Sequence, residues 1–183
     1  MAMEAMSLQV VSAMGALCLV LGATVCAQAD PGDKDAAEGK LMVATCQFPV
    51  SGDIAANGEW IRRQMREAAE QKADIVHLPE CALSGYAGKD HADLDNLDWH
   101  SLRKETESIL ALAKELGVWV VLGSTHRLSD GHKPHNSLYV ISAEGKIIDR
   151  YDKRFCTNGD LKHYSLGDHF VTFTVNGVKF GLL

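Results

Sequence analysis

Residues 73–86 read ADIVHLPECALSGY, a short apolar run followed by a proline and a glutamate. Such a run, rich in β-branched residues, is typical of a strand that is buried on both faces. Pro79 has no backbone N–H and cannot continue a central ladder, so the strand is expected to end before it. Glu80 is therefore predicted to lie on the loop at the carboxyl end of a buried strand, where open α/β sheets bind their ligands.

Two further apolar strands and two amphipathic helices are predicted around this stretch. Residues 41–48 (LMVATCQF) and 118–125 (VWVVLGST) are nearly continuous apolar runs. Residues 57–73 and 98–116 carry apolar side chains at helical spacing, and Asn57 is the expected N-cap of the first helix. The order strand, helix, strand, helix, strand predicts an α/β fold with a sheet and helices on at least one face.

Two hairpins are predicted to follow the third strand. Residues 136–142 (NSLYVIS) and 147–153 (IIDRYDK) flank a turn that contains glycine. Residues 169–175 and 178–183 flank the dipeptide Asn-Gly at 176–177, a strong hairpin signal. Hairpins add antiparallel strands, so the sheet is expected to be mixed.

The first 39 residues differ from the rest of the chain. Residues 8–25 form an apolar run that the sequence Ala-Gln-Ala at 27–29 follows, which is the pattern of a signal peptide (residues 1–29) with its cleavage site. Residues 30–39 are small and polar, as in a flexible linker. The sequence thus predicts an exported protein, periplasmic or secreted, with a folded domain at 40–183. Glu4 is unusual in a leader, and an uncleaved leader that anchors the protein to a membrane is the alternative.

Composition limits the partners of this chain. Its 183 residues are 46% hydrophobic and 23% charged, which suits one domain, and the net charge is -6. An acidic chain without a basic patch is not drawn to nucleic acid or anionic lipid, so we expect a small neutral or cationic partner and no stable membrane insertion after cleavage. Cleavage would leave Cys46, Cys81 and Cys156, an odd number that argues against a disulfide scaffold.

Glu80 and Lys153 are the charged residues that close two predicted strands. A carboxylate and an amine at neighbouring strand ends can act as proton acceptor and oxyanion stabiliser. The alternative is a structural ion pair at a sheet edge.

The chain from Leu41 to Leu183 resembles the nitrilase superfamily of carbon–nitrogen hydrolases. The specific segments are ADIVHLPECALSGY, which holds Glu80, and NSLYVISAEGKIIDRYDK, which holds Lys153. The resemblance implies an α-β-β-α sandwich with a mixed sheet, helices on its outer face and a catalytic Glu, Lys and Cys. Glu80 and Lys153 match the first two, whereas the cysteine would fall just beyond Leu183. The domain is therefore expected to be truncated at its carboxyl end, and this chain alone to be inactive.

Other residues are weaker candidates for the site. Many members of the superfamily carry a second glutamate where this chain has Asp160, which we expect to orient Lys153 or a substrate amine, or to cap a loop. His163 is a candidate for a substrate contact or a plain surface residue. The three cysteines of the domain are poor nucleophile candidates, because Cys46 lies in a predicted buried strand and the other two are expected to point away from Glu80 and Lys153.

The loop at residues 126–135 gathers four possible metal ligands. His126, Asp130, His132 and His135 have no standard zinc spacing, and the Gly and Pro among them indicate an exposed turn. No metal site is predicted here, and the mechanism that the resemblance implies needs neither a metal nor an organic cofactor.

The full-length protein is therefore expected to hydrolyse a non-peptide carbon–nitrogen bond of an amide or carbamoyl substrate. The resemblance implies a homo-oligomer, at least a dimer. The alternative is a noncatalytic truncated half-domain that serves, if anything, as an association module.

Overall fold

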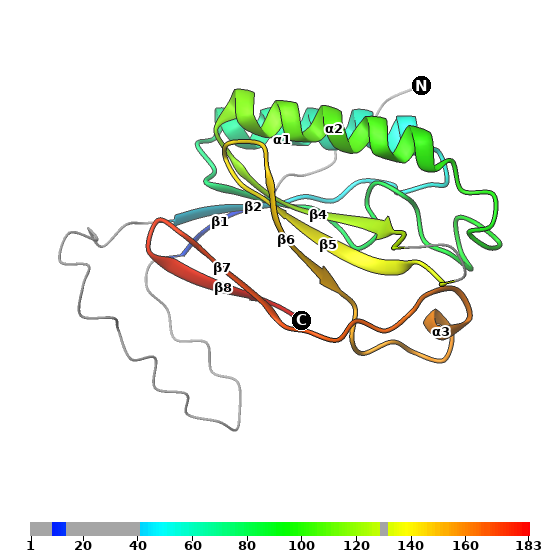
Figure 1. Ribbon diagram of the computed structural model, residues 1–183. Helices are drawn as coiled ribbons and strands as arrows, with labels where there is room; N and C mark the ends of the chain where they lie inside the picture. Colours follow the sequence, from blue (N-terminus) through cyan, green and yellow to red (C-terminus); the bar gives the residue numbers. More distant parts are fainter. Residues whose placement is uncertain (1–8, 14–40, 129–131) are drawn as a thin grey trace.

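The computed structural model describes residues 9–13, 41–128 and 132–183 (Figure 1). Most of the predicted leader and all of the predicted linker lie outside the described residues. The exception is β1 (Gln9–Ala13), which pairs antiparallel with the first strand of the domain. The signal peptide and the domain boundaries stay predictions. No helix among the described residues is long and apolar enough to span a membrane.

A six-stranded mixed sheet forms the centre of the domain, in the order β1-β2-β3-β4-β5-β6. Three strands run parallel and are joined by helices, and the last two are added antiparallel as a hairpin. Their bounds are β2 (Leu41–Thr45), β3 (Ile75–His77), β4 (Trp119–His126), β5 (His135–Ile141) and β6 (Ile147–Asp152). The predicted mixed α/β sheet is confirmed.

Two helices, α1 (Ile54–Glu70) and α2 (Trp99–Leu116), lie side by side over one face of this sheet (Figure 1). Both begin at an aspartate whose side chain accepts a hydrogen bond from a backbone N–H of the first turn. The prediction that Asn57 caps α1 is wrong, because the helix begins earlier, at the N-cap Asp53. Asn57 instead hydrogen-bonds backbone groups of Ser51 and Leu83, and so ties the helix to two loops.

The opposite face of the sheet is covered by a separate hairpin, β7 (Val171–Val175) and β8 (Val178–Leu182) (Figure 1). Phe173 stacks on Trp119 of the sheet with ring centres 6.0 Å apart, and Phe180 stacks on Phe173 at 5.2 Å. The described residues thus form a helix layer, a sheet and part of a second β layer. The last strand, β8, is largely exposed because within the described residues it pairs only with β7.

Each central strand therefore contributes to two cores. On β3, Val76 packs on the helix side and Ile75 on the hairpin side, and both are almost fully buried. Burial of both faces explains why these strands are continuous apolar runs. It also fixes which side chains share a face: residues of β5 with odd numbers lie toward the helices, and those with even numbers lie toward the hairpin.

Candidate active site

Glu80 lies three residues beyond the end of β3, as the sequence predicted. The loop that holds it passes over Gly123 of β4, where any Cβ atom would clash with the backbone of Pro79. A glycine in the neighbouring strand therefore allows this close approach. The Glu80 side chain is 49% exposed, so solvent and small molecules reach it.

Lys153 directly follows β6, and its side chain reaches Glu80. Its Nζ lies 2.8 Å from Glu80 Oε1. Its backbone N–H donates to the carbonyl of Asn136 on β5, at 2.8 Å, which fixes the lysine at the strand end. The structure thus brings together the two residues that the sequence placed at neighbouring strand ends.

Asn136 belongs to the same cluster, although sequence reasoning missed it. Its Nδ2 donates to Glu80 Oε1 at 2.6 Å, and its Oδ1 accepts from the thiol of Cys81 at 3.4 Å. Both contacts to Glu80 use Oε1, and Oε2 has no hydrogen-bond partner among the described residues. One carboxylate oxygen is held in place and the other remains available as an acceptor.

Asp160 approaches Lys153 from the other side. It opens the short helix α3 (Asp160–His163), which was not predicted, and its Oδ2 lies 3.1 Å from Lys153 Nζ. Asp160 is buried, with its side chain only 3% exposed, and it also accepts hydrogen bonds from the hydroxyl of Tyr86 and the backbone N–H of Thr157. Asp160 thus makes two of the contacts that were expected as alternatives: it contacts Lys153, and it accepts a hydrogen bond from the backbone of the loop at Thr157.

The charges of this cluster are set by these contacts. Burial alone would raise the pKa of Asp160, but the hydrogen bonds from Tyr86, Thr157 and Lys153 outweigh it and lower that pKa to about 2. Burial alone would lower the pKa of Lys153, but its hydrogen bonds to Glu80 and Asp160 raise it above its usual value. Lys153 is therefore a permanent cation at neutral pH, suited to stabilise negative charge rather than to accept a proton.

None of the three described cysteines is a good nucleophile. Burial raises the pKa of Cys46 and of Cys81 to about 12, and it also raises the pKa of Cys156. The backbone at Cys81 is not extended, because its φ is 51° and the residue turns the loop away from the strand. Its thiol faces Asn136 and Tyr164 in the interior rather than solvent.

The histidines that the sequence singled out make no hydrogen bond to Glu80 or Lys153 within the described residues. His163 is half-buried on α3, but it makes no hydrogen bond with a described residue and does not line the cavity beside Glu80. The expectation that residues 126–135 form an exposed turn is wrong at its end, because His135 opens β5 and is buried. Asp130 lies outside the described residues, and no group of three metal-ligating side chains occurs within the described ones.

A cavity of about 310 Å³ lies against the cluster. Glu80, Asn136, Lys153 and His77 form its polar part, and Leu183 lies in the same lining. A volume in this range accommodates a small organic molecule.

Comparison with known proteins identifies the family. Residues 42–183 match the carbon-nitrogen hydrolase family. The chain belongs to that family. The matched residues begin within β2 and include Glu80, Lys153 and Asp160.

Several proteins that are similar to this chain are amidases. The chain is 31% identical over 152 residues to the omega-amidase NIT2 of Homo sapiens, covering 78% of this chain and 53% of that protein. It is 31% identical over 142 residues to the 2-oxoglutaramate amidase of Bacillus subtilis, again with 53% of that protein covered. It is also 28% identical to the glutamine-dependent NAD(+) synthetase of Acinetobacter baylyi, over 78% of this chain and 26% of that protein.

Solved structures share the fold. An amidase from Nesterenkonia sp. superposes with a TM-score of 0.70 at 16% identity, over 78% of this chain and 54% of that one. In one structure of that amidase, the acetamide moiety of fluoroacetamide is covalently added at its active site cysteine. The chain therefore spans about half the length of the amidases that it matches.

Proposed function

We propose that the complete protein hydrolyses the carbon–nitrogen bond of a small amide or carbamoyl compound by a Glu-Lys-Cys mechanism. The observation that carries this proposal is the 2.8 Å contact between Glu80 and Lys153 beside a small cavity. The relatives that are amidases support the amide as substrate class. In this proposal the described chain is inactive on its own, because none of its described cysteines acts as the nucleophile.

The nucleophile is a cysteine that follows Leu183 in the complete protein. Leu183 lines the same cavity as Glu80 and Lys153, which supports this position for the next residues. The active site cysteine of the Nesterenkonia amidase, which shares the fold, supports the residue type.

Glu80 acts as general base in the first half of the reaction. Its free oxygen takes the thiol proton, and the sulfur then bonds to the carbonyl carbon of the substrate. The carbon–nitrogen bond breaks as the nitrogen takes the proton back from Glu80, so ammonia or an amine leaves and a thioester forms. In the second half, Glu80 takes a proton from water and the hydroxide attacks the thioester. The carbon–sulfur bond then breaks as the sulfur takes that proton from Glu80, which releases the acid and restores the thiol.

Lys153 stabilises the oxyanion that forms at both attacks. Its charge is permanent because it stays protonated between Glu80 and Asp160. A fixed cation next to a developing negative charge lowers the barrier without reorganisation at the moment of reaction. Asp160 holds the lysine from its buried side, so it acts through Lys153 rather than on the substrate.

Covalent labelling tests this proposal. The complete protein is incubated with fluoroacetamide, whose carbon–fluorine bond is replaced by a carbon–sulfur bond on reaction with a thiolate, and the labelled peptide is identified by mass spectrometry. We expect the label on a cysteine in the residues directly after Leu183, and slower labelling in the variant Glu80→Gln. Labelling confined to Cys156, or a gene without a cysteine at that place, would contradict the mechanism and favour the noncatalytic association module.

Export, a membrane anchor as its alternative, and a homo-oligomeric full-length protein are also proposals. The first two depend on residues 1–29, and the third follows from the family. Fractionation of the native host and the mass of the complete protein in solution test them.

A further inference from the structure

A second cavity lies on the helix face of the sheet. It measures about 770 Å³ and lies between α2 and the strands β4 to β6. Its lining shares no residue with the cavity beside Glu80, and Tyr139 in its wall packs in the core under the helices. Leu138 and Tyr151, which line the first cavity, pack on the hairpin side. The sheet therefore separates the two cavities.

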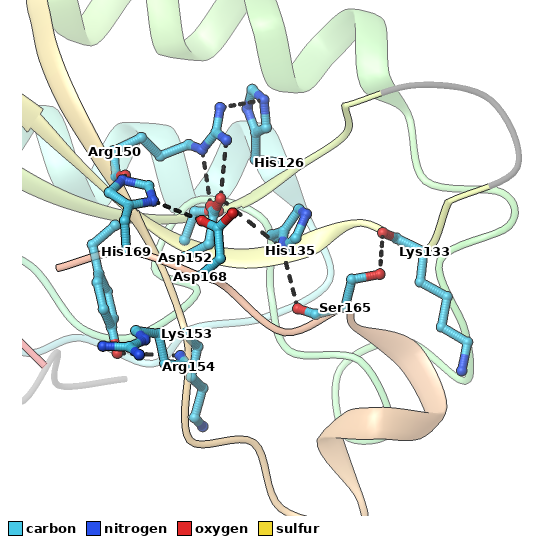
Figure 2. A network of polar contacts seen from close by, with 12 residues as sticks. His126, Lys133, His135, Arg150, Asp152, Lys153, Arg154, Ser165, Asp168 and His169 are labelled. Carbon is cyan, nitrogen blue, oxygen red and sulfur yellow. Dashed lines mark hydrogen bonds and ion pairs between the residues drawn. The ribbon is translucent and has the colours of Figure 1, made fainter. Parts of the chain in front are cut away.

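A chain of polar contacts ends at this second cavity, and Figure 2 shows its inner part. Arg150 donates through Nε and Nη2 to the two oxygens of Asp152, at 2.8 and 2.9 Å, and its Nη1 lies 2.6 Å from His126 Nε2. His126 Nδ1 lies 2.7 Å from the hydroxyl of Tyr139. Both His126 and Tyr139 line the cavity.

These contacts fix the protons of the chain. A guanidinium group can only donate, so His126 Nε2 must accept and the ring proton must be on Nδ1. Burial and the charge of Arg150 lower the pKa of His126, so the ring is neutral at pH 7. The Nδ1–H group then donates to the oxygen of Tyr139. The hydroxyl of Tyr139 keeps its own proton and must donate it elsewhere.

That hydroxyl has no acceptor among the described residues. Tyr139 is only 9% exposed, and the contact with His126 is its only hydrogen bond within the described chain. A buried donor without an acceptor is unfavourable, so a ligand that supplies an acceptor here gains that hydrogen bond.

The walls and rim of the cavity define the rest of such a ligand. Trp99, Leu102 and Leu110 of α2 supply apolar walls. The exposed Arg103 lies in the same lining and makes no ion pair with a described residue. The lining thus joins apolar walls to two hydrogen-bond donors, the hydroxyl of Tyr139 and the guanidinium of Arg103, which together complement an anion that carries an apolar group.

We propose that this cavity is a binding site for a small carboxylate with an apolar body, whose carboxylate accepts the hydrogen bond from Tyr139 and lies near Arg103. This site is separate from the proposed catalytic site and does not depend on the proposed function.

Calorimetric titration of the complete protein tests the site with two matched probes, 4-phenylbutyrate and the uncharged 4-phenylbutanol. We expect 4-phenylbutyrate to bind more tightly than the alcohol. Tyr139→Phe should weaken its binding about tenfold or more, because a hydrogen bond to a charged group is lost. Ile147→Asp should weaken it as well, since this exposed residue would add a negative charge to the lining of the same cavity.

The variant Lys153→Gln separates this site from the catalytic one. Binding of 4-phenylbutyrate should be unchanged in Lys153→Gln, whatever happens to hydrolysis. Equal affinity for the two probes, no binding of the carboxylate, or binding that is lost in Lys153→Gln and kept in Ile147→Asp would each overturn the proposal. If Tyr139→Phe does not fold, the exposed position Ile147 decides the matter alone.

Discussion

Lys153 contacts two carboxylates that differ in burial. Asp160 is almost fully buried and has a depressed pKa, so it is a permanent counter-ion. Glu80 is half-exposed and keeps one oxygen free of protein contacts within the described residues. Of the two carboxylates, Glu80 is therefore the one accessible to substrate and water, which supports Glu80 as the base and Asp160 as the supporting residue of the proposed mechanism.

The pKa of Asp160 leads to a prediction on acid stability. It falls from 3.8 to about 2 on folding, so the unfolded chain binds more protons between these values, and the stabilisation is lost as the pH falls from about 4 to about 2. Asp160→Asn should lower the free energy of unfolding at pH 7 by about 2 kcal/mol, and the difference should shrink at low pH. Denaturant unfolding of the complete protein at several pH values measures this.

Asp95→Asn is the control for that measurement, because Asp95 is exposed in the loop before α2. It should leave the pH dependence of unfolding unchanged. A pH dependence that is the same in Asp160→Asn and the parent would contradict the role of Asp160.

Asn136 offers a test of how the base is tuned. Asn136→Asp keeps the shape of the side chain but replaces the donor to Glu80 Oε1 by a second carboxylate. Like charges at this distance hinder ionisation, so the acid limb of the pH profile of kcat/KM should move to higher pH. Asn96→Asp, an exposed residue of the loop before α2, makes the same chemical change without this effect. An unmoved acid limb in Asn136→Asp would exclude Asn136 from tuning the base.

Residue motifs predicted part of this cluster. Glu80 and Lys153 could be found because each closes a strand within a specific motif, and Asp160 because many members of the superfamily carry a second glutamate at its position. Asn136 and Tyr86 could not, because their contacts depend on the register of β5 and on the fold of the loop after Glu80. The sequence signal that could have pointed to Asn136 as a site residue was its polar side chain near the start of a predicted strand.

At the scale of elements, the loop after β3 depends on Gly123 of β4. Gly123→Ala would push a Cβ atom into the Pro79 backbone and move Glu80. We expect a loss of about 1–3 kcal/mol in the free energy of unfolding, together with a lower kcat. Gly159→Ala is the control, because Gly159 has a helical backbone and room for a Cβ atom. Thermal unfolding and amide hydrolysis by both variants measure the effect, and equal behaviour would contradict it.

Element prediction succeeded where local signals were strong. Asp98 and Gly117 begin and end α2, and the Asn-Gly turn joins β7 to β8 as expected, with positive φ at both turn residues. It failed at the start of α1, because Asp53 and Asn57 are both residue types that can cap a helix, and tertiary contacts decide which of them does so. It also missed α3, a helix of four residues that has no periodicity to detect.

At the scale of the whole molecule, the β7–β8 hairpin covers the face of the sheet opposite the helices. Phe173 lies between Trp119 and Phe180 and joins the two layers. Phe173→Ala should therefore lower the free energy of unfolding by about 3–5 kcal/mol. Phe155→Ala, at a residue that is 73% exposed, should change it little. Chemical denaturation compares the two, and similar losses would mean that the hairpin does not pack as described.

The layers of the molecule could be predicted only in part. Apolar runs in β2, β3 and β4 indicated a sheet buried on both faces, but the sequence does not say which element covers each face. That assignment depends on contacts between distant segments, such as Trp119 with Phe173.

Steady-state hydrolysis of a small amide by the complete protein, compared between the parent and Glu80→Gln, is the most direct test of the central claim. Glutamine keeps the size of the side chain but cannot accept the thiol proton, so kcat/KM should fall at least about a thousandfold while the melting temperature changes little. A Glu80→Gln variant that folds and keeps most of the parent activity would show that Glu80 is not the base.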